Sequence, residues 1–148
     1  MLPKYHIAFG FLFCLVLELL FPSIKLPFIF LTFLASFLID FDHYLTAVIK
    51  TKSLSFSKAY SHHIEEGKKW MIKHKMGLRE KEHFHVLHTI EFITFVGILS
   101  FVWVGFFYIF IGLVFHSLLD IIHLLHHNIL YIREFTLGNW ITKRLRKN

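Results

Sequence analysis

The sequence predicts an all-α integral membrane protein, a four-helix bundle with an amphipathic cytoplasmic loop helix between its second and third spans. Of the 148 residues, 55% are hydrophobic, and 19 Phe help to raise the mean hydropathy to +0.57, well above soluble domains. The apolar residues form runs long enough to cross a hydrocarbon core of about 30 Å. Charged residues are concentrated between and after these runs. At this length, residues 1–148 form a single membrane domain.

The first two spans are expected at residues 5–21 and 26–44. The first run is similar to the apolar part of a signal peptide, but it lacks a small-residue cleavage site and a second apolar run follows it, so we expect a retained span. The second run ends in Asp40-Phe-Asp42. At a helix end, where the backbone turns, both carboxylates could point at one ion. The alternative is a polar boundary that only ends the span.

Residues 50–83 have a different composition, with nine Lys or Arg and four Glu. Apolar side chains at Phe56, Tyr60, Ile64 and Met71 recur at helical spacing. This pattern predicts an amphipathic helix in a cytoplasmic loop, lying on the membrane surface.

The chain is almost continuously apolar from Phe84 to Asn128. As one helix this stretch would be about 67 Å long, more than twice the thickness of the hydrocarbon core. It must therefore fold back once, and we expect spans at 84–101 and 105–127. The turn is placed near Trp103, because aromatic residues favour the membrane interface. A basic C-terminal segment, 129–148, follows.

The basic residues indicate the orientation. Of the 16 Lys and Arg, 15 lie in the N-terminus, the 50–83 loop or the C-terminal segment, and only Lys25 lies on the other side. The positive-inside bias therefore predicts a multi-pass protein of the cell (inner) membrane with both termini cytoplasmic. The formal charge of +6 is assigned to contacts with anionic membrane lipids, and no nucleic-acid partner is expected.

Ionisable side chains inside the last apolar run indicate a functional site. His116, Asp120 and His123 are four and three residues apart, so on a helix they share one face. An acid and two imidazoles in hydrocarbon are costly unless they pair, meet water or hold a metal. With the predicted topology, all four spans deliver such groups to the cytoplasmic side, which predicts a metal or proton-handling site there. The candidate ligands are His6, Asp40, Asp42, His85, His88, His116, Asp120 and His123.

The donor types narrow the choice of metal. Cys14 is the single cysteine, so thiolate-rich sites are excluded. Imidazole and carboxylate ligands suit zinc, with manganese or iron as alternatives, and the number of candidates exceeds one coordination shell, so one or two ions are expected. Near the headgroups, such a site would meet substrates with a polar ester and an apolar tail.

Four short blocks together resemble the YdjM-like (LexA-binding) family of inner-membrane metal-dependent hydrolases. These blocks are His6-Ile-Ala-Phe-Gly10, Ile39-Asp-Phe-Asp-His43, His85-Val-Leu-His-Thr-Ile-Glu91 and Gly112-Leu-Val-Phe-His-Ser-Leu-Leu-Asp120. The chain departs from the family pattern where Ile39 replaces a Pro. The third block lacks an Arg, and His83 is an alternative to His85 as the ligand preceding His88, with His85 favoured.

This resemblance implies a helical fold distantly similar to zinc-dependent phospholipase C and related nucleases, and hence phosphoester hydrolysis. The expected mechanism is attack by metal-activated water on a lipid or lipid-linked phosphoester. We expect Asp120 and Glu91 to be catalytic, with Glu91 as a base or bridging ligand and His123 as a ligand or its hydrogen-bond partner.

Three other functions fit parts of the pattern. The sequence His123-Leu-Leu-His-His127 is similar to the histidine boxes of membrane di-iron hydroxylases and desaturases, which require several such boxes. A metal or proton transporter could use the same carboxylates, although four spans make a small scaffold for alternating access. A structural membrane protein could carry histidines that only pack at interfaces.

Overall fold

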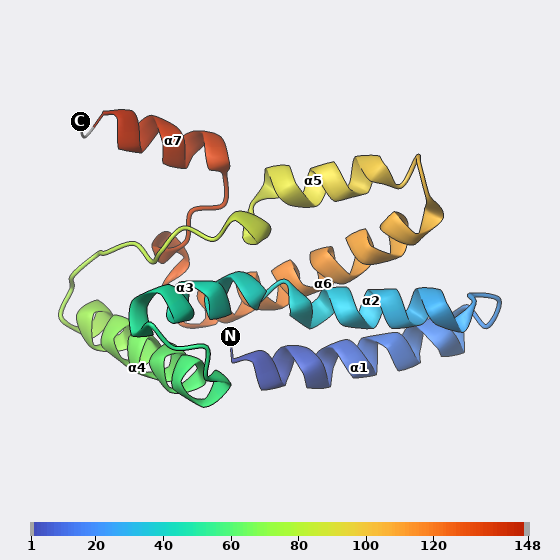
Figure 1. Cartoon of the computed structure of the whole chain (residues 1–148), viewed down its shortest axis with the longest axis horizontal. Helices are drawn as coiled ribbons and strands as arrows, with labels where there is room; N and C mark the ends of the chain where they lie inside the picture. Colours follow the sequence, from blue (N-terminus) through green and yellow to red (C-terminus); the bar gives the residue numbers. More distant parts are fainter. Residues whose placement is uncertain (1, 147–148) are drawn as a thin grey trace.

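The computed structural model describes residues 2–146, which form α-helices and short 3₁₀ turns without any strand (Figure 1). In chain order the helices are α1 (Pro3–Leu20), α2 (Leu26–Leu38), α3 (Phe41–Thr51), α4 (Phe56–Lys75), the 3₁₀ turn η1 (Val86–His88), α5 (Ile90–Leu99), α6 (Val104–His126), the 3₁₀ turn η2 (Leu130–Ile132) and α7 (Leu137–Leu145). The all-α prediction is thus confirmed for the described residues.

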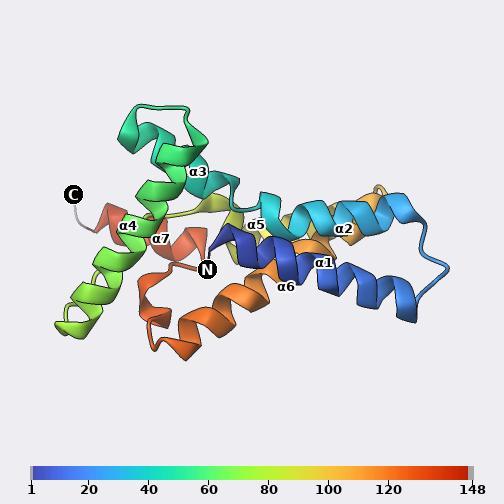
Figure 2. The same ribbon diagram turned by 90° about the horizontal axis from the view of Figure 1, so that it is seen from below.

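Three helical stretches are long and apolar enough to cross a membrane: α1, α2 together with α3 (Leu26–Thr51), and α6. α1, α2 and α6 run side by side along the long axis of the molecule in both views (Figures 1 and 2), and α2 contacts both of the others. The α1–α2 loop and the α5–α6 turn lie at one end, while α3, α4, α7 and the N-terminus lie at the other (Figure 1).

Two glycines allow α2 to approach its neighbours closely. A Cβ atom on Gly112 of α6 would lie 2.4 Å from the carbonyl oxygen of Thr32, and one on Gly10 of α1 would lie 2.1 Å from Oγ of Ser36. The Thr32 hydroxyl also donates a hydrogen bond of 3.1 Å to the carbonyl of Tyr108 on α6. Small residues and side-chain hydroxyls thus hold these helices together, as is usual for helices in a membrane.

The expected third span, 84–101, is not one continuous helix. The chain forms η1 first, and α5 has only ten residues, about 15 Å or half of a hydrocarbon core. The prediction of a full-length helix is therefore wrong. The physical reason is that Thr89 begins α5, its hydroxyl accepting a 3.2 Å hydrogen bond from the backbone of Phe92, while the preceding residues are drawn into polar contacts described below. α6 starts at Val104, so the chain reverses close to Trp103, as the sequence predicts.

The loop expected at residues 50–83 contains a helix, as predicted. α3 extends to Thr51, and α4 packs back against it as a helical hairpin. The ring of Phe56, at the start of α4, stacks on Tyr44 of α3 with centroids 4.7 Å apart. At the C-terminus, α7 stands apart from the three long helices (Figure 1), and Trp140 on α7 stacks on Phe84 at 4.6 Å.

Candidate metal centre

The end of the bundle that carries α3 and α4 also holds a cluster of buried histidines and aspartates. Four separate segments supply it: α1, the α2–α3 junction, the η1 region and α6. The contributing residues are His6, Asp40, Asp42, His43, His85, His88, His116 and Asp120. Their donor atoms fall into two adjoining groups, an inner one and an outer one.

The inner group lies between α1, the α2–α3 junction and α6. Nε2 of His116 lies 3.5 Å from Oδ1 of Asp40 and 3.5 Å from Oδ2 of Asp120, and Nε2 of His6 lies 3.2 Å from Oδ1 of Asp120. The His6 and His116 rings stack with centroids 3.8 Å apart. His6 and His116 are both completely buried, and Asp120 is 2% exposed. Two imidazoles and two carboxylates therefore converge in a space closed to solvent.

A hydrogen bond fixes how His116 faces this group. Its Nδ1 lies 2.9 Å from the carbonyl oxygen of Ser36, and because a carbonyl can only accept, Nδ1 must carry the proton. In the neutral ring, Nε2 is then the lone-pair atom, and it points at Asp40, Asp120 and His88. Backbone support of this kind is typical of metal-binding histidines.

The outer group surrounds Asp42 at the start of α3. Nδ1 of His85 lies 3.5 Å from Oδ1 of Asp42, and the rings of His43 and His85 are 3.7 Å apart. His88 joins the two groups, because its Nδ1 lies 3.1 Å from Oδ2 of Asp42 and its Nε2 lies 3.5 Å from Oδ1 of Asp40. Asp40 belongs to both groups, since its Oδ1 also lies 3.8 Å from Nε2 of His43.

The Asp-x-Asp segment therefore lies at a helix end, as the sequence predicts, but its two carboxylates diverge. Asp40 is the residue preceding α3 and Asp42 belongs to its first turn. The carboxylate of Asp40 faces the inner group and that of Asp42 faces the outer one. The two acids thus enter different three-residue groups rather than one.

Several donor atoms of the cluster are buried without a hydrogen bond within residues 2–146. They are Nδ1 and Nε2 of His6, Oδ2 of Asp40, Oδ1 of Asp42 and Nδ1 of His85. Nε2 of His6 does lie 3.2 Å from Oδ1 of Asp120, and Nδ1 of His85 lies 3.5 Å from Oδ1 of Asp42; a buried polar atom left with no such contact costs about 1–3 kcal/mol. A divalent ion would satisfy donor atoms of these types, all within 4.8 Å of one another in each group of three. The donor set therefore fits a metal bound through imidazole and carboxylate.

The two histidines near η1 have pKa values shifted in opposite directions. Burial lowers the pKa of His85 to about 4, so its ring is neutral at pH 7 and can donate a lone pair to a metal. Burial acts in the same direction on His88, but the adjacent carboxylates of Asp40 and Asp42 outweigh it and raise the pKa of His88 to about 9. His88 therefore carries a proton at neutral pH that a metal would displace.

An arginine that the sequence reasoning did not select is ion-paired to the inner group. Nη1 of Arg133 donates to Oδ2 of Asp120, and its Nε donates to Oε1 of Glu82 at 2.7 Å. Arg133 is 8% exposed, and these two carboxylates keep the pKa of its guanidinium above the ordinary value despite burial. The single positive charge of Arg133 is shared between Glu82 and Asp120. It therefore does not balance the negative charges of Asp40, Asp42 and Asp120 together.

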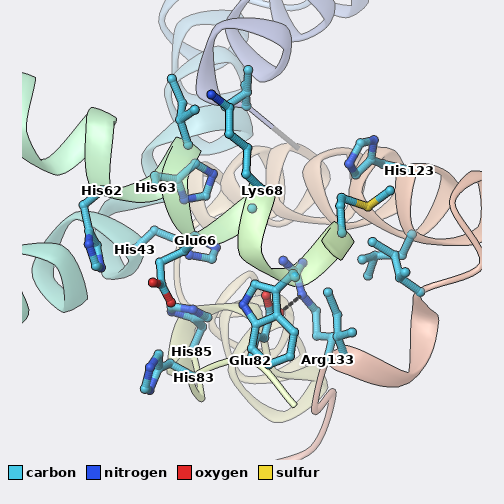
Figure 3. A pocket seen from close by; sticks show the side chains of 18 of the residues that line it. His43, His62, His63, Glu66, Lys68, Glu82, His83, His85, His123 and Arg133 are labelled. Atoms are coloured by element: carbon cyan, nitrogen blue, oxygen red, sulfur yellow. Dashed lines mark hydrogen bonds and ion pairs between the residues drawn. The ribbon is translucent and has the colours of Figure 1, made fainter. Parts of the chain in front are cut away.

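A pocket of about 960 Å³ opens beside the outer group. Figure 3 shows His43, His85 and Glu82 on its walls near Arg133, with His123 on the opposite side. Apolar side chains from α1, η2 and α4 also line it, together with charged side chains that include Lys50, Glu66 and Lys68. The cluster is thus reached from a cavity that is apolar over much of its surface.

Two predicted site residues lie elsewhere. His123 lines the pocket but belongs to neither group; it shares a helix face with His116, but seven residues displace it by about 10 Å along the axis, where its ring meets His127 at 4.6 Å. The exposed Glu91 carboxylate accepts a 3.3 Å hydrogen bond from the backbone N–H of Gly138 at the start of α7. A catalytic role for Glu91 has no support in this position.

Two other histidines lie close to the candidate ligands. His83, the alternative to His85, is exposed and lines the pocket outside the two groups. His43 was not selected as a ligand from the sequence, although it lies three residues after Asp40 and directly after Asp42. That spacing at a helix start brings its side chain to the Asp40 side, and this signal was available in the sequence.

Searches of protein-family models, curated proteins and solved structures gave no match to this chain.

Proposed function

We propose that this chain is a membrane-bound, metal-dependent hydrolase that cleaves a phosphoester of a lipid or lipid-linked substrate. One observation carries the proposal: histidines and aspartates from four separate segments meet in one place, and several of their buried donor atoms make no hydrogen bond within the described residues. A cluster serving only to pack helices would be expected to satisfy its polar atoms internally. The geometry therefore favours a metal centre over a structural role.

In this proposal each group holds one divalent ion, zinc being favoured and manganese or iron being alternatives, with Asp40 shared between them. When bound, the ions would lower the pKa of a water molecule toward about 7 and neutralise charge that develops on phosphoryl oxygens. His6, His116 and Asp120 would serve the inner ion, while Asp42, His43 and His85 would serve the outer one. His88, whose Nε2 lies 3.5 Å from Oδ1 of Asp40 and 3.9 Å from Oδ2 of Asp120, would also serve the inner ion.

Neighbouring residues keep the ligands in place. The Ser36 carbonyl orients His116, and Asp42, which also accepts a 3.3 Å hydrogen bond from the backbone of Leu87, orients the ring of His88. The burial of His6, His116 and Asp120 shows that bulk water is excluded from the inner group. Such fixed ligands reduce the reorganisation needed during a reaction.

The lipid character of the substrate is supported by the position of the pocket. Its walls include Tyr5 and Phe9 of α1, a helix apolar and long enough to cross a membrane, and both residues are exposed. An apolar tail could therefore lie along α1 with its polar end at the histidines. The phosphoester class comes from the resemblance to the YdjM-like family, and the distribution of Lys and Arg favours a cytoplasmic location for the site.

The test combines metal analysis with hydrolysis. Purified protein in detergent should contain stoichiometric zinc or manganese and should release phosphate or a phosphomonoester from vesicles of phosphatidylethanolamine and phosphatidylglycerol. Chelator should abolish release, and His116→Ala should lose both metal and activity. His126→Ala is the matched control, because His126 is an exposed histidine on the same helix.

Activity that persists in His116→Ala would assign the hydrolysis to a contaminant and contradict the proposal. Stoichiometric iron without hydrolysis would favour an oxidative enzyme similar to the di-iron hydroxylases. Absence of metal after purification and after addition of zinc would favour a structural protein. Metal that moves across a vesicle membrane without hydrolysis would favour a transporter.

A further inference from the structure

Arg133 is a buried arginine whose surroundings hold it firmly at the edge of the metal centre. It follows η2 directly and packs beside a buried apolar cluster that contains Ile129 and Ile132. Backbone hydrogen bonds join its segment to the η1 region on both sides: Glu82 N–H donates to Ile132 at 2.9 Å, and Ile90 N–H donates to Phe135 at 2.9 Å. The guanidinium therefore has a fixed position relative to the histidines that precede α5.

The two carboxylate partners of Arg133 use only part of its hydrogen-bonding capacity. A guanidinium has five N–H donors, and the contacts to Glu82 and Asp120 engage Nε and Nη1. No hydrogen bond within the described residues uses Nη2. Since Arg133 also lines the pocket, Nη2 is the amino group that the guanidinium can offer to a ligand there.

This position places a permanent cation next to the candidate metal ligands. Oδ2 of Asp120 accepts a hydrogen bond from Arg133 and lies 3.5 Å from Nε2 of His116. The guanidinium therefore contacts the inner group through the carboxylate of Asp120. Its other carboxylate partner, Glu82, also lines the pocket. An arginine held by two acids at fixed angles is suited to a planar or tetrahedral oxyanion, which it can contact through more than one N–H.

We infer that Arg133 binds the anionic phosphoryl group of the substrate, and that Glu82 positions it for this task. The inference rests on the proposed hydrolase function and adds the residue that selects for a phosphoryl oxyanion over an uncharged ester. In this arrangement the phosphoryl oxygens meet Nη2 of Arg133 beside the metal centre, and the apolar part of the substrate extends toward Tyr5 and Phe9, which line the same pocket.

Binding of inorganic phosphate to the zinc-loaded protein in detergent, measured by titration calorimetry, tests the inference without requiring turnover. Arg133→Lys retains the positive charge but loses the fork of N–H donors. It should leave the zinc content unchanged and weaken phosphate binding by about tenfold, the effect of losing one charge-assisted hydrogen bond. The matched control is Arg79→Lys, because Arg79 is exposed and contacts the ring of Tyr131 instead of the pocket.

A second variant guards against failure of Arg133→Lys to fold. Glu82→Ala keeps the arginine and its pair with Asp120 but removes the contact at Nε, so it should also weaken phosphate binding with little change in zinc content. Phosphate affinity equal to wild type in the folded variants would overturn the inference while leaving the hydrolase proposal standing. Loss of zinc together with phosphate binding in Arg133→Lys would show that Arg133 only balances the charge of Asp120, and would also overturn the inference. Zinc-loaded wild type that binds no phosphate at millimolar concentration would contradict both proposals.

Discussion

Asp120 is the residue at which metal binding and stability can be separated most clearly. Its carboxylate is 2% exposed, forms an ion pair with Arg133 and lies 3.2 Å from Nε2 of His6. The substitution Asp120→Asn keeps the shape of the side chain but removes its charge. It should therefore affect two properties, the affinity for metal and the free energy of unfolding of the metal-free protein.

The magnitudes follow from these contacts. Removing one partner of a buried ion pair costs about 3–5 kcal/mol, because the remaining charge is left uncompensated. Arg133 keeps its contact with Glu82, so the lower limit, about 3 kcal/mol, is expected for Asp120→Asn. Loss of a direct metal ligand should weaken zinc binding by more than the roughly 10–100-fold effect of losing an outer hydrogen-bond partner.

The assay is unfolding in mixed micelles with SDS as denaturant and chelator present, followed by zinc titration against a competing dye. The double variant Asp120→Asn with Arg133→Met is the control, because removing both members of a buried pair is often close to neutral. It should recover only part of the lost stability, because Glu82 also loses its partner Arg133, and none of the zinc affinity. Wild-type zinc affinity in Asp120→Asn would show that the inner group is wrongly assigned, and unchanged stability would refute the energetic role of the pair with Arg133.

Three further outcomes are expected. His43→Ala should reduce the metal content from two ions to one per chain by mass spectrometry, whereas the exposed His126→Ala should not change it; equal content in both would eliminate the outer ion. Gly112→Ala should destabilise the protein by about 1–3 kcal/mol through overpacking, because the added Cβ would lie 2.4 Å from the α2 backbone, whereas Gly67→Ala, with nothing within 4 Å, should not destabilise it. Apparent zinc affinity should rise by up to about tenfold per pH unit as the pH approaches 9, because the metal displaces the proton of His88, whose pKa is raised to about 9; a flat profile from pH 6 to 8 would exclude His88 as a ligand.

Helical periodicity and hydropathy predicted much of the architecture. Apolar runs identified α1, α2 and α6, and the amphipathic pattern after residue 50 identified α4. The same reasoning failed for 84–101, because hydropathy does not record where polar contacts interrupt a helix. In the structure, His85 and His88 turn toward Asp42 before the helix begins.

For the site, the sequence indicated its acidic and imidazole composition, and the structure gathers five predicted ligands with Asp40 and Asp42: His6, His85, His88, His116 and Asp120. Asp42 belongs only to the outer group, whereas Asp40 belongs to both, and His88 joins the two. Glu91 is acidic, like other residues of the site, but it lies outside the site. Spacing along one helix does not determine which of its faces meets other segments. Its carboxylate lies instead at the start of α7.

The sequence alone determined that this chain is helical and apolar enough to cross a membrane, and that ionisable residues recur along its apolar stretches. These properties are local, because they depend on residue type and on spacing within one helix. Only the tertiary structure decided which ionisable residues meet. The contact between Arg133 and Asp120 depends on the turn at η2, and that between His6 and Asp120 depends on the close packing of α1 and α6 with α2. Such contacts join residues far apart in sequence, so no local pattern can encode them.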